Sequence, residues 1–474
     1  MSYERLSAQD ASFLHFEHRA TPMHVAALAI FAKGPLATAD GGLDFERLAK
    51  HVESRLHLLP RYRRKLALTP LDRHPVWVDD ARFELGYHVR RAGLPRPGDD
   101  GALRELVART LSQPLDRARP LWELLLVDGL AGERFAIVSK VHHCMVDGVS
   151  GANLLTLLFS TSPEEEVAGV PAWAPRPAPT PVRLLRDEVV RQVGLPFALL
   201  GRARSALREP RRAWADVAET AVALGEAFEA GLRVASATPL NRPTGPHRRV
   251  DWHGVELEVV KEVKRRLGGT VNDVVLAAVA GALHRFLGER GVWLAKLDYR
   301  VVIPVNMRPP GDDLSASNRV SALFLALPVA EADPLRRYAI IQSETRRLKG
   351  SRAAEGTDLL ARFADWSGSS GLVRFGVRFV SRLRPYNLIV TNVPGPQMPL
   401  YVLGAPLLEL YPFLPLFDQQ GLGVAALSQQ GRIGFGLMAD WEIVPDLSRL
   451  THALDAALRE LHDAARGRRK PSSG

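Results

Sequence analysis

The run VHHCMVDG, residues 141 to 148, constrains the fold more than any other part of the chain because it joins a strand to a helix. Phe135–Val141 has the character of a strand, and Gly151–Phe159 has that of a helix. Asp147 and Gly148 favour a tight turn between them. Such a unit fixes an imidazole ring on rigid elements and leaves one of its nitrogens free.

The two adjacent histidines leave three interpretations open. Because side chains alternate along a strand, His142 and His143 point to opposite faces. An imidazole moves protons near neutral pH, which favours acid–base catalysis. Two imidazoles and the Asp147 carboxylate also suit iron or zinc, although neither an HExxH pattern nor clustered cysteines accompany them. The third interpretation is a turn that polar side chains merely satisfy, and we expect Cys144 to fill space rather than act as a nucleophile.

Length and charge narrow the class of protein. A chain of 474 residues predicts two or more domains, and 46% hydrophobic with 24% charged residues is typical of a globular protein. The net charge of +10 reflects either arginine-rich codon usage or attraction to CoA phosphates, an anionic membrane or nucleic acid. Because no nucleic-acid-binding signature accompanies the charge, we expect no nucleic-acid partner.

Three features bear on the compartment. The lone Cys144 excludes an internal disulfide framework and favours a reducing cytoplasm. The N-terminus has no apolar run typical of a secretory signal, and runs such as Val274–Leu283 are shorter than the ~20 residues of a spanning helix. We therefore expect a cytoplasmic protein, either free or peripheral on the inner face of the plasma membrane or on lipid inclusions.

Two basic segments each allow two interpretations. Val182–Arg212 holds eight arginines against three carboxylates, interspersed with leucines. It predicts a helix that lies on a membrane surface, or one that packs on its own protein with a solvated basic face. Arg61–Lys65 predicts either a site for CoA phosphates or a solvated helix end.

Strand and helix patterns alternate through both halves of the chain, which predicts an α/β fold. The Pro- and Ala-rich stretch from Val170 to Pro181 is an expected boundary. The expected parts are an N-terminal domain over 1–162 with the histidine run, a Pro-rich linker and basic helical connector over 163–245, a C-terminal domain over 246–465, and a disordered basic tail over 466–474. The expected elements include helices over Asp10–His18, Asp44–Arg55, Val182–Arg208, Ala213–Val234 and Val274–Leu287, and strands over His24–Ala32, Tyr299–Val305, Leu388–Thr391 and Phe435–Ala439.

HHxxxDG, here His142 to Gly148, resembles the signature of the chloramphenicol-acetyltransferase-like acyltransferases, which include peptide-synthetase condensation domains. Further blocks resemble the bacterial wax ester synthase/diacylglycerol acyltransferase family, in that family's order and over almost the whole chain. These blocks are Ser12-Phe13-Leu14, Pro22-Met23-His24-Val25, Pro120-Leu121-Trp122-Glu123, Asn272-Asp273, Pro304-Val305-Asn306-Met307-Arg308 and Asn392-Val393-Pro394-Gly395-Pro396. Together they are far more specific than HHxxxDG alone.

The resemblance implies two chloramphenicol-acetyltransferase-like α/β domains with mixed sheets, flanking helices and an active site at their interface. It implies transfer of a fatty acyl group from acyl-CoA to diacylglycerol, giving triacylglycerol, or to a long-chain alcohol, giving a wax ester. Acyl-CoA is then a co-substrate, and neither cofactor nor metal is implied. Two alternatives stay open: another HHxxxDG acyltransferase with a carrier-protein-bound donor, and a non-catalytic lipid-binding protein.

The same resemblance assigns roles within the run. His143 is the expected general base, which takes the proton of the acceptor hydroxyl without an acyl-enzyme. His142 is expected to orient the loop or support the base. Asp147 is expected to pair with an arginine, for which Arg308 is the candidate, and Gly148 gives the turn its backbone freedom.

The remaining candidates lie in other blocks. Asn272 is the expected donor to the tetrahedral oxyanion, with Thr391 and Asn392 as weaker candidates. The alternative role for Asn272 is a helix cap before Val274. Pro120, Leu121 and Trp122 are expected to pack in the core or to form a wall of the tunnel for an acyl chain or alcohol.

Overall fold

The computed structural model describes residues 3–145, 157–164, 167–193, 234–306, 320–349 and 385–467. Asp147, Gly148 and Arg308 lie outside the described residues, as do most of Gly151–Phe159 and all of the expected helix Ala213–Val234 except Val234. Residues 466 and 467, which were expected in the tail, belong to the last helix, and the rest of the expected tail lies outside the described residues.

The described strands form three sheets. The small sheet has the order β1-β4-β3, with β1 Tyr3–Arg5, β4 Pro75–Asp79 and β3 Arg64–Leu68. The first six-stranded sheet has the order β12-β13-β2-β7-β6-β5, with β12 Tyr401–Val402, β13 Ala405–Phe413, β2 His24–Ala32, β7 Arg134–His142, β6 Trp122–Leu130 and β5 Val89–Gly93. The second has the order β10-β9-β11-β14-β15-β8, with β10 Val320–Ala326, β9 Arg300–Asn306, β11 Leu388–Pro394, β14 Leu422–Gln429, β15 Arg432–Asp440 and β8 Arg248–Glu256.

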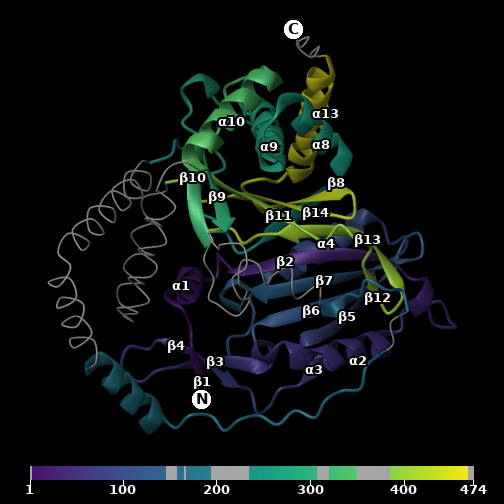
Figure 1. The fold of residues 1–474 in the computed structure, drawn as a ribbon, viewed down its shortest axis with the longest axis vertical. Coiled ribbons are helices and arrows are strands. Elements are labelled where there is room, and N and C mark those ends of the chain that lie inside the picture. Colours follow the sequence, from purple (N-terminus) through teal and green to yellow (C-terminus); the bar gives the residue numbers. More distant parts are fainter. Residues whose placement is uncertain are drawn as a thin grey trace.

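Helices cover the outer faces of both large sheets (Figure 1). The α-helices are α1 Ala8–Phe16, α2 Phe45–Arg55, α3 Leu85–His88, α4 Asp100–Ser112, α8 Leu257–Leu267, α9 Val271–Gly288, α10 Pro334–Lys349 and α13 Leu447–Gly467. The 3-10 helices are η1 Gly34–Leu36, η2 Leu56–Leu58, η3 Pro60–Arg63, η4 His143–Met145 and η5 Leu294–Lys296. Helices α8, α9, α10 and α13 lie on the second sheet, α2 and α3 lie on the first, and α4 lies between the sheets (Figure 1). The predicted α/β class with mixed sheets is confirmed.

The apolar helix α9 forms the centre of the second half. Thirteen of its residues, including Val274 and Leu283, are buried, and they pack against the second sheet and α13. Among the described residues α9 is the one helix long and apolar enough to cross a membrane, and 72% of that window is buried inside the protein. Its apolar length is therefore accounted for by core packing.

Several elements coincide with those expected from the sequence. β2 covers His24–Ala32 as predicted, and α2 begins after Asp44, whose side chain accepts the N–H of Arg47. β11 was expected to end at Thr391, which is wrong: it continues to Pro394 because Asn392 and Val393 pair with the parallel strand β14. A neighbouring strand supplies hydrogen-bond partners that the local sequence does not reveal.

The domain boundaries expected from the sequence need one correction. β12 and β13, from the second half of the chain, complete the first sheet, where β13 pairs with β2 from Phe413↔Ala26 to Leu407↔Phe31. The expected C-terminal domain over 246–465 therefore gives two strands to the sheet of the expected N-terminal domain over 1–162. The chain crosses between the two large sheets, and main-chain hydrogen bonds hold β13 of the second half in the first sheet.

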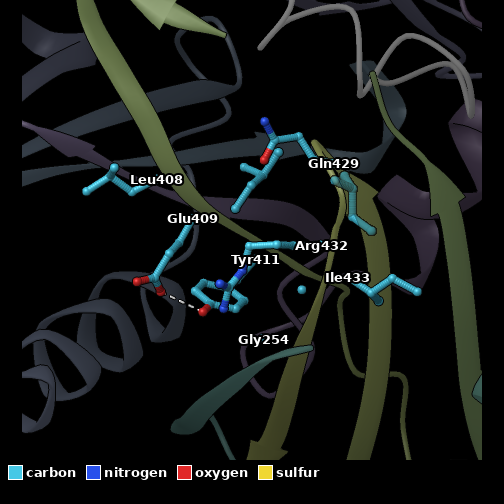
Figure 2. A pocket seen from close by; sticks show the side chains of 10 residues that line it. Gly254, Leu408, Glu409, Tyr411, Gln429, Arg432 and Ile433 are labelled. Atoms are coloured by element: carbon cyan, nitrogen blue, oxygen red, sulfur yellow. Dashed lines mark hydrogen bonds between the residues drawn. The ribbon is translucent and has the colours of Figure 1, made fainter. Parts of the chain in front are cut away.

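Glycines allow the two sheets to approach where β15 crosses β13. A Cβ atom on Gly436 would lie 1.8 Å from the carbonyl oxygen of Pro412, and one on Gly434 would lie 2.1 Å from that of Leu410. Figure 2 shows the crevice beside this crossing, where the Tyr411 hydroxyl donates to Glu409 Oε2 at 2.6 Å. The crevice holds about 10 Å³, the space of a single water molecule, so it is a packing seam and not a substrate site.

The Pro-rich linker packs on the first half instead of spanning solvent (Figure 1). Arg176 donates to both carboxylate oxygens of Asp79, at 2.8 and 3.0 Å. The indole of Trp173 meets the Phe83 ring at a centroid distance of 6.1 Å, with the Arg63 guanidinium 5.2 Å above that indole. The linker is thus held by ion pairs and aromatic contacts.

Residues 181–193 after the linker form a helix that packs on the small sheet. Its inward face carries Leu184 and Glu188, which are 7% and 1% exposed, and the Glu188 carboxylate accepts the N–H groups of Leu71 and Asp72. For residues 181–193 these contacts support the second interpretation given above, a basic helix that packs on its own protein. Its outer face nevertheless exposes Val182 and Val190.

The close crossing of β13 and β15 predicts a large cost for adding one methyl group. Gly436→Ala forces a Cβ into the Pro412 carbonyl. We expect the free energy of unfolding to fall by about 1–3 kcal/mol, the usual cost of overpacking. Gly34→Ala is the matched control, since its added Cβ meets nothing within 4 Å. Chemical denaturation of both variants measures the difference, and equal unfolding midpoints would show that the sheets separate freely at this point.

Candidate active site

The two histidines lie where β7 ends and η4 begins. His142 is the last residue of β7 and is fully buried, whereas His143 opens η4 and is half-buried. Neighbouring strands hold this point from both sides: the His142 N–H donates to Leu121 O at 2.9 Å, and the His143 N–H donates to Met23 O at 2.8 Å. The change from strand to 3-10 turn, rather than strand alternation alone, gives the two rings different surroundings.

The His143 ring lies against an aromatic side chain of α1. Phe13 stacks on it with a centroid distance of 3.8 Å and an interplanar angle of 16°. Its Nδ1 is buried, and no described residue hydrogen-bonds to it. Burial lowers the pKa of the His143 imidazole to about 4, a contact with its own backbone opposes that shift, and the neighbouring His142 adds to it. The ring is therefore neutral near pH 7 and able to accept a proton.

His142 faces a carboxylate behind the site. Its Nε2 lies 3.4 Å from Glu17 Oε1, and its Nδ1 accepts the backbone N–H of Cys144 at 3.1 Å. Because Nδ1 is an acceptor, the ring proton belongs on Nε2, toward Glu17. Burial alone would raise the pKa of the Glu17 carboxyl, but His142 and Arg117 outweigh it and lower the pKa to about 2.

Cys144 is fully buried in the apolar core of the first half. Burial raises the pKa of its thiol well above the ordinary range. A buried thiol without thiolate character fills space, as the sequence predicted, and is not a nucleophile.

Asn272 is not the cap of α9. Thr270 is the N-cap: its hydroxyl accepts the Asp273 N–H at 3.2 Å, and Asp273 Oδ2 accepts the Thr270 N–H at 2.7 Å. Thr345 of α10 also donates to Asp273 Oδ1, at 2.8 Å. Asp273 of the Asn272-Asp273 block is thus structural. The neighbouring Asn272 side chain is half-buried and makes no hydrogen bond with another described residue. The capping alternative for Asn272 is wrong, and its role as an oxyanion donor stays a prediction.

The block Pro120-Leu121-Trp122 lies in the core. Leu121 and Trp122 are 0% and 1% exposed. Trp122 donates from Nε1 to Tyr62 O at 2.7 Å and stacks on His88 at a centroid distance of 4.7 Å. Through the Leu121 carbonyl the block also receives the N–H of His142. These contacts are those of core packing that supports the histidine strand, and the tunnel-wall role stays a prediction.

The basic run at 61–65 is neutralised by carboxylates. Arg61 and Arg64 both donate to Glu4, at 2.8 and 2.6 Å, and Lys65 Nζ lies 2.9 Å from Asp80. The run contains the end of the 3-10 helix η3 at Arg63 and the start of β3 at Arg64, so the predicted helix end is present, but Arg61, Arg64 and Lys65 are paired with carboxylates. Within the described ranges, no group of three or more His, Cys, Asp or Glu side chains is arranged to hold a metal ion.

Two features near His143 could not have been identified from the sequence. Glu17 follows α1 and bears no resemblance to a catalytic pattern, yet it contacts His142. The second feature is an apolar cluster on the inner face of the second sheet, which Phe16 of α1 reaches by an edge contact with Phe417 at 5.2 Å. The cluster consists of Val302, Ile389, Leu414 and Ala425, flanked by Ala322, Phe324, Tyr386 and Phe417. An alternation of apolar residues could have predicted strands there, but not their proximity to α1.

Comparisons with known proteins agree with this architecture. Residues 6–275 match the model of the wax ester synthase/diacylglycerol acyltransferase catalytic domain, and residues 316–462 match that of the C-terminal domain of the same family. A putative diacylglycerol O-acyltransferase of Mycobacterium tuberculosis is 35% identical over 97% of this chain and 90% of its own length. A probable diacylglycerol O-acyltransferase of the same species is 33% identical over 96% of this chain and 95% of its own length.

Solved structures give the same picture. The wax ester synthase/diacylglycerol acyltransferase from Marinobacter aquaeolei VT8 superposes with a TM-score of 0.69 at 27% identity, covering 98% of this chain and all of that one. The first condensation domain of the calcium-dependent antibiotic synthetase shares the fold, with a TM-score of 0.59 at 18% identity over 98% of this chain and 96% of that one. The chain therefore belongs to the wax ester synthase/diacylglycerol acyltransferase family and is an O-acyltransferase.

Proposed function

We propose that this enzyme transfers a fatty acyl group from acyl-CoA to the hydroxyl of diacylglycerol or of a long-chain alcohol, with His143 as the general base. The observation that carries the proposal is the position of the His143 imidazole just after β7, where it is half-buried, stacks on Phe13 and has an Nδ1 to which no described residue hydrogen-bonds. The relatives named as diacylglycerol O-acyltransferases support diacylglycerol as one acceptor.

In the proposed reaction Nδ1 of His143, beside its own backbone, keeps the ring proton, and Nε2 takes the proton of the acceptor hydroxyl. The acceptor oxygen attacks the thioester carbonyl carbon and gives a tetrahedral oxyanion. The carbon–sulfur bond then breaks, the ester leaves, and the imidazolium returns the proton to the CoA thiolate. No acyl-enzyme forms, so neither a serine nor the buried Cys144 is needed.

Three further assignments belong to the proposal. Asn272, whose side chain the capping box leaves free, donates to the oxyanion, an interaction worth about 10²–10³ in kcat where it has been measured. Asp147 pairs with Arg308 and, with Gly148, holds the loop after His143. The acyl chain or the alcohol lies along the apolar cluster that contacts Phe16, since each buried methylene contributes about 0.8 kcal/mol.

Replacement of the base tests the chemistry. We expect His143→Ala to lower kcat by about 10²–10⁴ while the protein stays folded, because general-base help is lost. Thiol release from palmitoyl-CoA, with hexadecanol, with diacylglycerol and without acceptor, measures it. The exposed His57, whose Nδ1 bonds only within its own turn, gives the matched control His57→Ala. A folded His143→Ala variant that keeps more than about a tenth of the wild-type kcat would exclude His143 as the base.

The same assay separates the competing functions. Acceptor-dependent thiol release from the free CoA ester supports the proposal. Turnover only with a carrier-protein-bound donor supports the condensation-type alternative, and no turnover with either donor supports a lipid-binding protein.

The lowered pKa of His143 predicts the acid limb of the pH profile. A histidine with an ordinary pKa of 6.5 would lose its basic form below pH 6.5, whereas burial keeps His143 deprotonated down to about pH 4. We therefore expect kcat/KM to hold from pH 7 to 5 and to fall as pH approaches 4. Activity at pH 7 after incubation at each acid pH controls for unfolding, and a reversible limb near 6.5 would mean that the base is not this buried ring.

We further propose that the outer face of helix 181–193 docks on an anionic lipid surface, where water-insoluble acceptors and products gather. Val182, Val190 and Val193 are 75%, 65% and 58% exposed and recur on one side of the helix, and the Arg186 side chain beside them is 72% exposed. The net charge of +10 favours an anionic membrane, each basic residue near the surface adding about 1 kcal/mol.

Vesicle cosedimentation tests this docking. We expect binding to phosphatidylglycerol vesicles, weaker binding to phosphatidylcholine vesicles, and loss of most of the bound fraction in the double variant Val190→Glu/Val193→Glu. Ile340→Glu, at a 41% exposed position on α10, is the control for a new surface carboxylate. If the double variant binds as the control does, another surface holds the membrane.

A further inference from the structure

We propose that Glu17 is a positioning residue, whose carboxylate holds the ring and the backbone that present His143 to substrate. The inference rests on the proposed function, in which His143 takes the acceptor's proton. Glu17 itself touches neither substrate nor the His143 ring. It acts through His142 and Met23.

The Glu17 carboxylate lies where three chain segments meet. It follows α1 directly, and its side chain is 8% exposed. Oε1 accepts the backbone N–H of Met23 at 3.2 Å and faces Nε2 of His142 at 3.4 Å. Oε2 accepts Nε of Arg117 at 2.8 Å. One carboxylate thus joins the end of α1, the start of β2 and the end of β7.

The groups that Glu17 holds are those that fix the backbone on both sides of the His143 ring. The His143 N–H donates to the carbonyl of Met23, whose own N–H is bound by Glu17. The next amide, that of Cys144, donates to Nδ1 of His142, whose Nε2–H faces Glu17. Both amides that flank the His143 Cα are therefore tied to partners of the same carboxylate.

The proton on His142 depends on this arrangement. For Nδ1 to accept the Cys144 N–H, the neutral ring must carry its proton on Nε2. A carboxylate opposite Nε2 stabilises that tautomer, as a carboxylate behind a histidine does in other catalytic sites. If the negative charge of Glu17 is removed, His142 can adopt the other tautomer, with its proton on Nδ1. That proton would point at the Cys144 N–H, and the hydrogen bond between them would be lost.

Arg117 keeps the carboxylate in place and ionised. Its Nη2 donates to the Leu14 carbonyl in the last turn of α1 at 2.9 Å, while its Nε bonds Glu17. With His142 it holds the pKa of Glu17 near 2 in spite of burial, so the carboxylate stays charged over the range in which the enzyme is assayed.

The isosteric variant Glu17→Gln removes the charge, keeps an oxygen for the Met23 N–H, and sets an amide NH₂ against the His142 Nε2–H. We expect kcat to fall about tenfold to hundredfold, the loss expected from a displacement of about 1 Å, with little change in KM for acyl-CoA. The shorter carboxylate of Glu17→Asp should recover part of the loss. Glu4→Gln is the matched control, since Glu4 is likewise a glutamate paired with arginine, here with Arg61 and Arg64, but lies 46% exposed.

Two readouts separate positioning from a general loss of stability. In a double-mutant cycle, Glu17→Gln/His142→Gln should be no slower than His142→Gln alone, to within about twofold, because both changes break the same link. In hydrogen–deuterium exchange the peptide over 142–145 should exchange faster in Glu17→Gln, and in Glu4→Gln it should match the wild type. The exchange measurement needs no substrate. It therefore tests whether Glu17 holds the backbone around His143 even if His143→Ala shows that the proposed function is wrong.

The inference is overturned if a folded Glu17→Gln enzyme keeps kcat within about twofold of wild type, if its effect multiplies with that of His142→Gln, or if exchange over 142–145 is unchanged. If Glu17→Gln does not fold, Arg117→Gln carries the same test, because it leaves the carboxylate but frees it. A smaller loss of kcat and faster exchange in the same peptide are then expected, and wild-type values for both would overturn the inference.

Discussion

The antiparallel pairing of β2 with β7 is the constraint on which the site depends. Their register runs from Ala32↔Arg134 to His24↔His142, so both strands reach the same edge of the sheet together. The residues before β2 therefore lie beside the residues after β7, and Met23 meets His143 by a main-chain hydrogen bond. A shift of one residue would turn His142 to the other face of the sheet and separate it from Glu17.

The two halves of the protein meet as a continuous core. β13 of the second half pairs with β2 of the first. β15 crosses β13 so closely that Gly434 and Gly436 have no room for a Cβ atom. Arg248 of β8, 1% exposed at its side chain, donates to the carbonyl of Ala20 at 2.5 Å, in the segment between Glu17 and Met23. Contacts from the second half thus help to shape the segment that holds the histidines.

Charged and neutral side chains are arranged in layers around the end of β7. The His143 ring, against Phe13, is kept neutral by burial, whereas Glu17 one layer behind is kept charged by His142 and Arg117. Farther along β7, the buried Lys140 Nζ lies 2.9 Å from Glu123. In the reaction that we propose, a low pKa makes the His143 imidazole a weaker base but secures its unprotonated form.

The α/β class, the family and the position of the histidine run could be predicted from the amino-acid sequence, because strand and helix periodicity and short motifs are local properties of the chain. The sequence also predicted β2 and α2 closely, since apolar content and the capping Asp44 mark their limits. Only long-range packing makes β12 and β13 join the first sheet, makes Thr270 rather than Asn272 the N-cap of α9, and places Trp122 in the core. The contact between Glu17 and His142, which are 125 positions apart in the sequence, likewise follows from strand pairing and packing between distant segments. No local pattern encodes such a pairing, whose energy is gained only when the whole sheet has formed.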